Sequence, residues 1–195
     1  MKIGVLASGG GTNLQALIDT VHGREVEIVA VASDRADAHA LARAQRAGIA
    51  TAVFDKADYP DRAVRDAAIA DWLDQRGVEL VVLAGYMALV DAGFVARYRD
   101  RILNVHPSLL PKYPGLDAIG QAIAAGEDEF GVTVHLVDEG MDTGPIVLQE
   151  SVSLPGATDP DAVLAALRPL EHRLLPEAVR RQAASSSPSS SSSSW

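Results

Sequence analysis

Two side chains that can stabilise an oxyanion and move a proton lie two residues apart. Asn104 and His106 end an apolar run, residues 102–106, which predicts a strand. Alternate residues of a strand share one face, so we expect both side chains on the same side. Prolines follow from Pro107 onward and cannot donate to a ladder, so the backbone must leave the sheet there. The pair is thus predicted at the carboxyl edge of a strand, where open α/β sheets bind ligands.

Asp142 is the acid best placed to join this pair. It lies in the segment D-E-G-M-D-T-G, residues 138–144, after a predicted strand over residues 130–137. An amide, an imidazole and a carboxylate together are the equipment of acyl transfer. Asp142 could instead simply close a turn between its flanking glycines, because Asp is a common turn residue.

A single histidine in a strand or helix is more often a packed core residue than a ligand. We interpret His135 and His172 in this way. For His106 the core interpretation is weaker, because Asn104 shares its face and a proline-rich loop opens beside it.

A glycine-rich turn near the start of the chain indicates an anion site. An apolar run, residues 2–7, ends in S-G-G-G-T-N and is followed by leucines at helical spacing. Such a turn points backbone N–H groups and a helix N-terminus at an anion, and Thr12 and Asn13 add side-chain donors. No Gly-Lys-Ser/Thr follows, and Leu14 stands where a dinucleotide fingerprint needs its last glycine, so a single phosphate is favoured. A tight strand-to-helix connection without a ligand is the alternative.

Asp34 supports a different class of function. It follows a predicted strand, residues 27–32, and lies about 20 residues past the glycines. A dinucleotide fold places there the acid that binds a ribose. A nicotinamide-dependent oxidoreductase is therefore the second hypothesis, disfavoured by the missing glycine.

The remaining apolar runs alternate between strand and helix patterns. Strands are expected at residues 49–54, 80–84 and 145–152, and helices at 38–47, 61–75, 117–125 and from 160 onward. The alternation predicts an α/β fold: a Rossmann-like, doubly wound, mostly parallel sheet with helices on both faces.

Two helices carry more specific expectations. Over residues 61–75, an apolar face of Val64, Ala68 and Trp72 leaves Arg62 and Arg65 on a solvated face, from which Arg62 could reach a ligand. In the last helix, Pro169 should introduce a kink or end its first half.

Composition sets the remaining bounds. The chain has 195 residues, a formal net charge of -9 and no cysteine, which gives no sign of nucleic-acid binding and excludes a thiolate metal site. We expect one domain over residues 1–182 and a disordered serine-rich tail over 183–195. The short apolar run before the glycines is no signal peptide or membrane span, so the expected location is cytoplasmic, without a membrane partner.

The motifs N-V-H-P-S-L-L-P-K-Y-P-G and G-V-T-V-H-L-V-D-E-G-M-D-T-G-P-I resemble the folate-dependent formyltransferases, and the resemblance extends from Met1 to about Val179. It is strongest to the members that act in purine synthesis. The resemblance implies transfer of a formyl group from 10-formyltetrahydrofolate to the amine of glycinamide ribonucleotide. It also implies a catalytic trio of Asn104, His106 and Asp142, no metal, no covalent intermediate, and a monomer or homodimer.

The resemblance further implies two groups of binding residues. Those for the nucleotide are Gly11, Thr12, Asn13, Arg168 and Glu171, with Glu171 holding the ribose. Those for the folate are Arg62, Met87, Ala88, Leu89, Val90, Asn104, Asp138, Glu139, Gly140, Met141 and Asp142.

The sequence departs from the family pattern at a few of these places. Ala88 stands where many members carry Arg or Lys, Asp117 where some carry His, and Arg168 where some carry Gln. Pro169 could shift Glu171. We interpret these departures as tuning, because the catalytic trio is intact.

Two alternatives stay open within this resemblance, and a third belongs to a different class of function. A methionyl-tRNA formyltransferase needs a further C-terminal domain and a basic surface, and a formyltetrahydrofolate deformylase needs an N-terminal regulatory domain. We expect neither in 195 residues. A phosphate-binding module without catalysis is the third, and it predicts that His106→Ala leaves all function intact.

Overall fold

The protein is built around one seven-stranded sheet. Its structure, a computed structural model, describes residues 1–186. The strand order is β3-β2-β1-β4-β5-β6-β7; the first five strands pair in parallel, and β5–β6 and β6–β7 pair antiparallel. The strands are β1 (Lys2–Leu6), β2 (Glu27–Ser33), β3 (Thr51–Val53), β4 (Leu80–Leu83), β5 (Ile102–His106), β6 (Glu129–Leu136) and β7 (Ile146–Ser153). The predicted α/β class with a mostly parallel sheet is confirmed.

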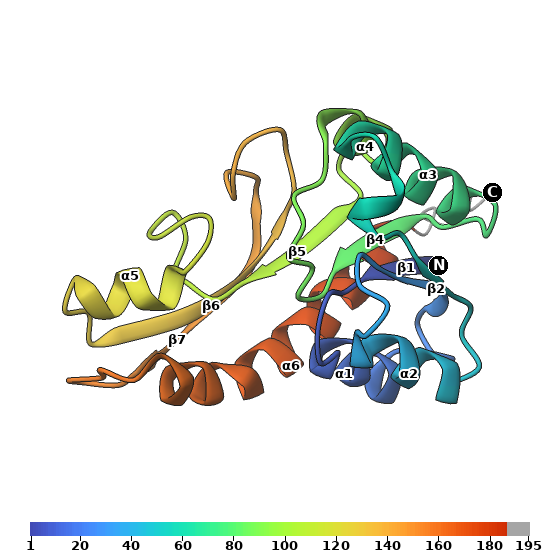
Figure 1. Ribbon diagram of the computed structural model, residues 1–195. Coiled ribbons are helices and arrows are strands. Elements are labelled where there is room, and N and C mark those ends of the chain that lie inside the picture. The colour runs from blue at the N-terminus through green and yellow to red at the C-terminus, as the bar shows by residue number, and fades with distance from the viewer. Residues whose placement is uncertain (187–195) are drawn as a thin grey trace, which may run out of the picture.

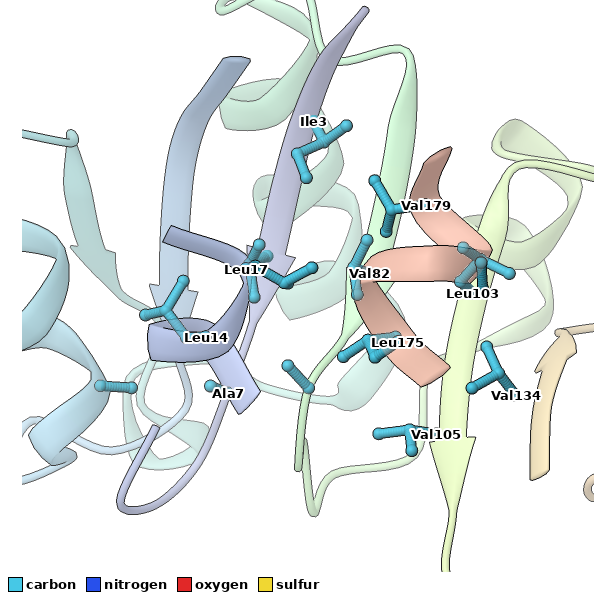
Figure 2. Packing of buried hydrophobic residues seen from close by; sticks show 14 of the residues in the cluster. Ile3, Ala7, Leu14, Leu17, Val82, Leu103, Val105, Val134, Leu175 and Val179 are labelled. Atoms are coloured by element: carbon cyan, nitrogen blue, oxygen red, sulfur yellow. The ribbon is translucent and has the colours of Figure 1, made fainter. Parts of the chain in front are cut away.

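Helices cover both faces of this sheet, as the alternating pattern predicted (Figure 1). They are α1 (Thr12–Thr20), α2 (His39–Arg46), α3 (Arg62–Asp74), α4 (Ala92–Arg97), α5 (Ala118–Ala124) and α6 (Pro160–Ser186), with a 3₁₀ turn at Lys56–Asp58. The helices α1, α2 and α6 pack into one apolar cluster, and α3 and α4 pack into a second cluster on the opposite face. Figure 2 shows Leu175 and Val179 of α6 gathered with Val82 and Leu103 of the central strands. Burial of apolar surface on both faces fixes the strand ends that carry the polar side chains.

The buried face of α3 differs from the predicted one. Val64 is 46% exposed, whereas Arg65 and Asp66 are 3% and 0% exposed. Arg65 Nη2 lies 2.7 Å from Asp66 Oδ1, so the two charges compensate each other inside the protein. The expectation that Arg65 lies on a solvated face is therefore wrong, while Arg62 is exposed.

The last helix is longer than expected. It runs through Pro169 and Pro176 without ending, because its buried leucines pack against the sheet and offset the lost backbone hydrogen bonds. It also extends over residues 183–186, which we had assigned to the tail. Alanine favours helix, and Ser185 and Ser186 each donate a hydroxyl hydrogen bond to the carbonyl four residues earlier. The rest of the predicted tail, residues 187–195, lies outside the described residues. No helix among the described residues is long and apolar enough to cross a membrane.

Candidate active site

The structure brings Asn104, His106 and Asp142 together beside the end of β5. Asn104 and His106 lie in this strand as predicted, and its antiparallel partner β6 places His135 opposite Asn104. Asp142 belongs to the loop between β6 and β7 and has a positive φ of 55°. The three side chains of the predicted trio are half-buried or buried, so their mutual contacts are partly screened from water.

His106 has its two ring nitrogens in different surroundings. Its Nε2 lies 2.8 Å from the carbonyl oxygen of Tyr113, which can only accept, so Nε2 carries a proton and donates it. Its Nδ1 lies 3.5 Å from Asp142 Oδ2. The second proton of a cationic His106 would therefore sit on the nitrogen that faces Asp142.

Asp142 is held as a carboxylate. A hydrogen bond with His135, the Gly115 backbone N–H and the nearby His106 lower its pKa from 3.8 to about 2, although burial opposes the shift. Gly115 N donates to Asp142 Oδ2 at 2.7 Å. Since Gly115 ends the proline-rich segment after β5, this bond ties the Asp142 loop to the segment that carries His106. Asp142 is an ionised base near neutral pH.

His135 is buried, as expected of a core histidine, but it also contacts the site residues, which the sequence did not suggest. It is 1% exposed, yet its Nε2 lies 3.2 Å from Asn104 Nδ2 and 3.4 Å from Asp142 Oδ1. Its Nδ1 lies 3.0 Å from the carbonyl oxygen of Leu136 and must donate to it. Nε2 therefore accepts from Asn104 Nδ2 when the ring is neutral, and donates to Asp142 Oδ1 only when the ring is protonated. His135 thereby orients the amide of Asn104. Only the register of β5 against β6 could have revealed this from sequence, since the two residues are 31 positions apart.

The glycine turn and α6 form a second polar region at the same edge of the sheet. Gly11 has a positive φ of 71°, and an added Cβ there would lie 2.6 Å from the Cα of Ala40. Asn13 Nδ2 donates to Glu171 Oε2 at 3.1 Å across 158 residues of sequence. Burial raises the pKa of Glu171, partly offset by Asn13 and by the charge of Arg168. The buried Asn13 Oδ1 has no hydrogen-bond partner.

The other predicted nucleotide residues lie close to this pair in sequence. Thr12 opens α1 and is half-buried, and Arg168 is exposed one turn before Glu171 on α6. The helix continues through Pro169, and Glu171 contacts Asn13 of α1.

The residues assigned to the folate come from two loops and one helix start. Residues 85–91 follow β4, and Met87 and Leu89 expose 67% and 56% of their surface. A pocket of ≈ 370 Å³ opens nearby on the 138–140 side of the Asp142 loop. Its lining residues are Val95, Ala96, Arg99, Asp100, Val137, Asp138, Glu139 and Gly140.

This pocket agrees with part of the predicted folate set only. Asp138, Glu139 and Gly140 line it, whereas residues 87–90 do not, and α4 supplies a wall that the sequence had not suggested. Arg62 is exposed in the first turn of α3, and the residues of that helix that contact the loop after β4 are Arg65, through Leu89 O at 3.4 Å, and Asp66, through Asp91 N at 2.7 Å. Within residues 1–186, no group of three or more His, Asp and Glu side chains could hold a metal ion.

Comparison with known proteins places the chain in a family. Residues 1–179 match the formyl transferase family, so the chain belongs to it. Within that family it groups with the phosphoribosylglycinamide formyltransferases. It is 44% identical over 181 residues to the one from Haemophilus influenzae, with 92% of this chain and 85% of the relative covered. For the Escherichia coli protein the identity is 40%, with 90% and 84% covered.

Solved structures give the same grouping. The crystal structure of glycinamide ribonucleotide transformylase 1 from Symbiobacterium toebii superposes with a TM-score of 0.91 at 46% identity, covering 95% of this chain and 88% of the other. The chain also matches 14% of the length of the trifunctional purine biosynthetic protein adenosine-3 of Drosophila pseudoobscura, at 42% identity.

Proposed function

We propose that the protein transfers the formyl group of 10-formyltetrahydrofolate to the amine of glycinamide ribonucleotide, a step of purine biosynthesis. The observation that carries the proposal is the contact of Asp142 with both His106 and His135 beside Asn104. This set of groups matches the needs of acyl transfer between nitrogens. The family relationship supports the formyl group as the acyl unit.

The amine of the nucleotide attacks the formyl carbon, forming a C–N bond and a tetrahedral oxyanion. Asn104 donates to this oxyanion with the N–H that His135 leaves free, and cationic His106 donates from Nδ1. Asp142 takes the proton that the amine must lose, directly or through a water, and supports the His106 cation. The tetrahedral intermediate then collapses with breakage of the C–N10 bond, and Asp142 passes its proton to N10, giving tetrahydrofolate and the N-formylated nucleotide.

The two substrates are assigned to the two polar regions. The nucleotide phosphate binds at Gly11, Thr12 and Asn13 on the N-terminal side of α1. Glu171 holds the ribose, with Arg168 beside it.

The folate occupies the side bounded by residues 87–90 and 138–142, with Arg62 near the edge of this region. The pocket of ≈ 370 Å³ has the size of a small-molecule site and supports only the part of this region at residues 138–140, because residues 87–90 do not line it. The protein acts as a monomer or homodimer and without a metal.

The first test follows folate absorbance with 10-formyltetrahydrofolate, with and without glycinamide ribonucleotide. We expect consumption only when the nucleotide is present. Consumption without it would point to a deformylase, and no consumption in either case would contradict the proposal.

A second test separates catalysis from binding. Asn104→Ala, His106→Ala and Asp142→Ala should each lower turnover about 10²-fold to 10³-fold while nucleotide binding survives. His22→Ala is the matched control, because His22 lies past the opposite end of α1 from the glycine turn. Full activity of His106→Ala would favour a phosphate-binding module instead.

A further inference from the structure

We propose that Ser8 is a positioning residue that couples the two substrate regions, so that nucleotide bound at the glycine turn strengthens folate binding. The inference rests on the proposed function, because it takes the glycine turn as the phosphate site and residues 85–91 as one wall of the folate site. Its basis is a set of hydrogen bonds that Ser8 makes across the gap between the loops after β1 and β4.

Ser8 uses both its backbone and its side chain for this purpose. It is 3% exposed and directly precedes the three glycines. Its backbone N donates to the carbonyl of Gly85 at 3.0 Å, and its Oγ accepts from the backbone N of Met87 at 2.8 Å. The hydroxyl in turn donates to Asp34 Oδ1 at 2.6 Å. One buried residue thus fixes two positions, Gly85 and Met87, in the first half of the proposed folate wall.

Asp34 sets the direction of this hydroxyl. Because the Ser8 hydrogen points to the carboxylate, a lone pair of Oγ is left for the N–H of Met87. The acid that a dinucleotide fold would use for a ribose is therefore engaged in holding the loop. The chain Met87–Ser8–Asp34 links the ends of β4, β1 and β2.

The topology of the sheet makes Ser8 the bridge. β1 and β4 are neighbours, but α1 packs on one face of the sheet and α4 on the other, so the connections that leave these strands diverge. A crevice opens at such a switch point, and ligands bind in it. A phosphate that orders the glycine turn would also restrain Ser8, and the hydrogen bond from Met87 N to Ser8 Oγ would extend that restraint to Met87.

The same wall has a second anchor that does not touch the glycine turn. At its far end, Asp66 Oδ2 accepts from the backbone N of Asp91 at 2.7 Å, and Arg65 Nη2 donates to Leu89 O at 3.4 Å. Both anchoring side chains come from α3. Loss of this anchor should weaken folate binding whether or not nucleotide is bound, which makes Asp66→Ala the matched comparison for Ser8→Ala.

The measurement is the dissociation constant of tetrahydrofolate by titration calorimetry, without and with saturating glycinamide ribonucleotide. This pair cannot react, because no formyl group is present. Coupling through one hydrogen bond corresponds to about fivefold, so we expect the nucleotide to tighten tetrahydrofolate binding by about that factor. The coupling is reciprocal, so tetrahydrofolate should tighten nucleotide binding equally.

In Ser8→Ala the ratio of the two dissociation constants should fall to about one. Asp66→Ala should instead keep the ratio while raising both dissociation constants. Asp34→Ala tests the same link from outside the glycine turn if Ser8→Ala does not fold, and it should also reduce the ratio. Asp34→Asn keeps an acceptor for the Ser8 hydroxyl, so it should preserve more of the coupling ratio than Asp34→Ala does.

A wild-type ratio of one would overturn the inference, and so would an unchanged ratio in Ser8→Ala or Asp34→Ala. If the wild-type protein binds neither ligand and transfers no formyl group, the proposed function itself has failed and this inference fails with it. If the wild-type protein transfers the formyl group but the Ser8→Ala variant keeps the wild-type ratio, only this inference is rejected and the proposed function stands.

Discussion

Asp142→Asn provides a quantitative test of the electrostatics at the site. The side chain is 14% exposed, so its interactions are little screened by solvent. Its pKa is lowered from 3.8 to about 2, and this difference corresponds to about 2 kcal/mol of stability at neutral pH. Asparagine keeps the volume and an oxygen for the Gly115 N–H, but it removes the charge that faces the two histidines.

The pH dependence gives the prediction its sign. A carboxyl group whose pKa is depressed by folding stabilises the protein above its ordinary pKa, and this contribution is lost as the pH falls through the folded value. The variant should therefore be less stable than the wild type by about 2 kcal/mol at pH 7 and at pH 5. The difference should begin to shrink below about pH 4 and disappear toward pH 2.

Urea unfolding at pH 7, 5, 4 and 3 measures this difference directly. Asp138→Asn is the control, because it is the same substitution in the same loop. The Asp138 carboxylate accepts from Gly140 N and Thr143 Oγ1 rather than facing the two histidines. A stability difference that stays constant from pH 7 to pH 3, or one of equal size in the control, would refute the electrostatic account.

Three further substitutions test other parts of the structure. Gly11→Ala requires a left-handed alanine whose Cβ would meet Ala40, so it should lower stability by roughly 2 kcal/mol in urea unfolding and raise the KM for the nucleotide. Burial raises the pKa of Glu171, so its ionised form destabilises the fold; Glu171→Gln should be more stable than wild type at pH 7 in thermal denaturation, with no advantage below pH 4. Arg65→Leu leaves Asp66 as an uncompensated buried charge and should cost about 3–5 kcal/mol in urea unfolding, part of which the additional change Asp66→Leu should restore.

Features that depend on local sequence could be predicted. The run that ends at Asn104 and His106 forms β5 with the expected bounds, because a short apolar run that stops at a proline has few alternatives to a strand. The glycine turn was predictable for a similar reason, since few residues other than glycine adopt a positive φ before a helix. The family resemblance implied that Glu171 and Asn13 bind the same nucleotide, but their direct contact was not predicted, because it spans almost the whole chain.

Three features could not be predicted, each for a different reason. His135 has the pattern of a core residue, and only its antiparallel pairing with Asn104 makes it part of the site. Arg65 is buried because Asp66 beside it compensates the charge, although arginine is rarely buried. The helix α4 spans six residues, too few for a periodic pattern, and its one local signal is Asp91, whose side chain caps it by accepting from Phe94 N.

The position of Asp142 depends on the antiparallel turn of the sheet more than on its own sequence. Because β6 runs against β5, Leu136 pairs with Leu103, and the loop that follows starts beside the beginning of β5 rather than beside His106. The loop must fold back to reach the histidine, and the positive φ of Asp142 with the hydrogen bond from Gly115 N holds it there. The loop is anchored at Gly115 through Asp142 itself, so substitution by alanine removes the base and the anchor together. Comparison of Asp142→Ala with Asp142→Asn should therefore separate the two roles, since asparagine retains the anchor and loses only the base.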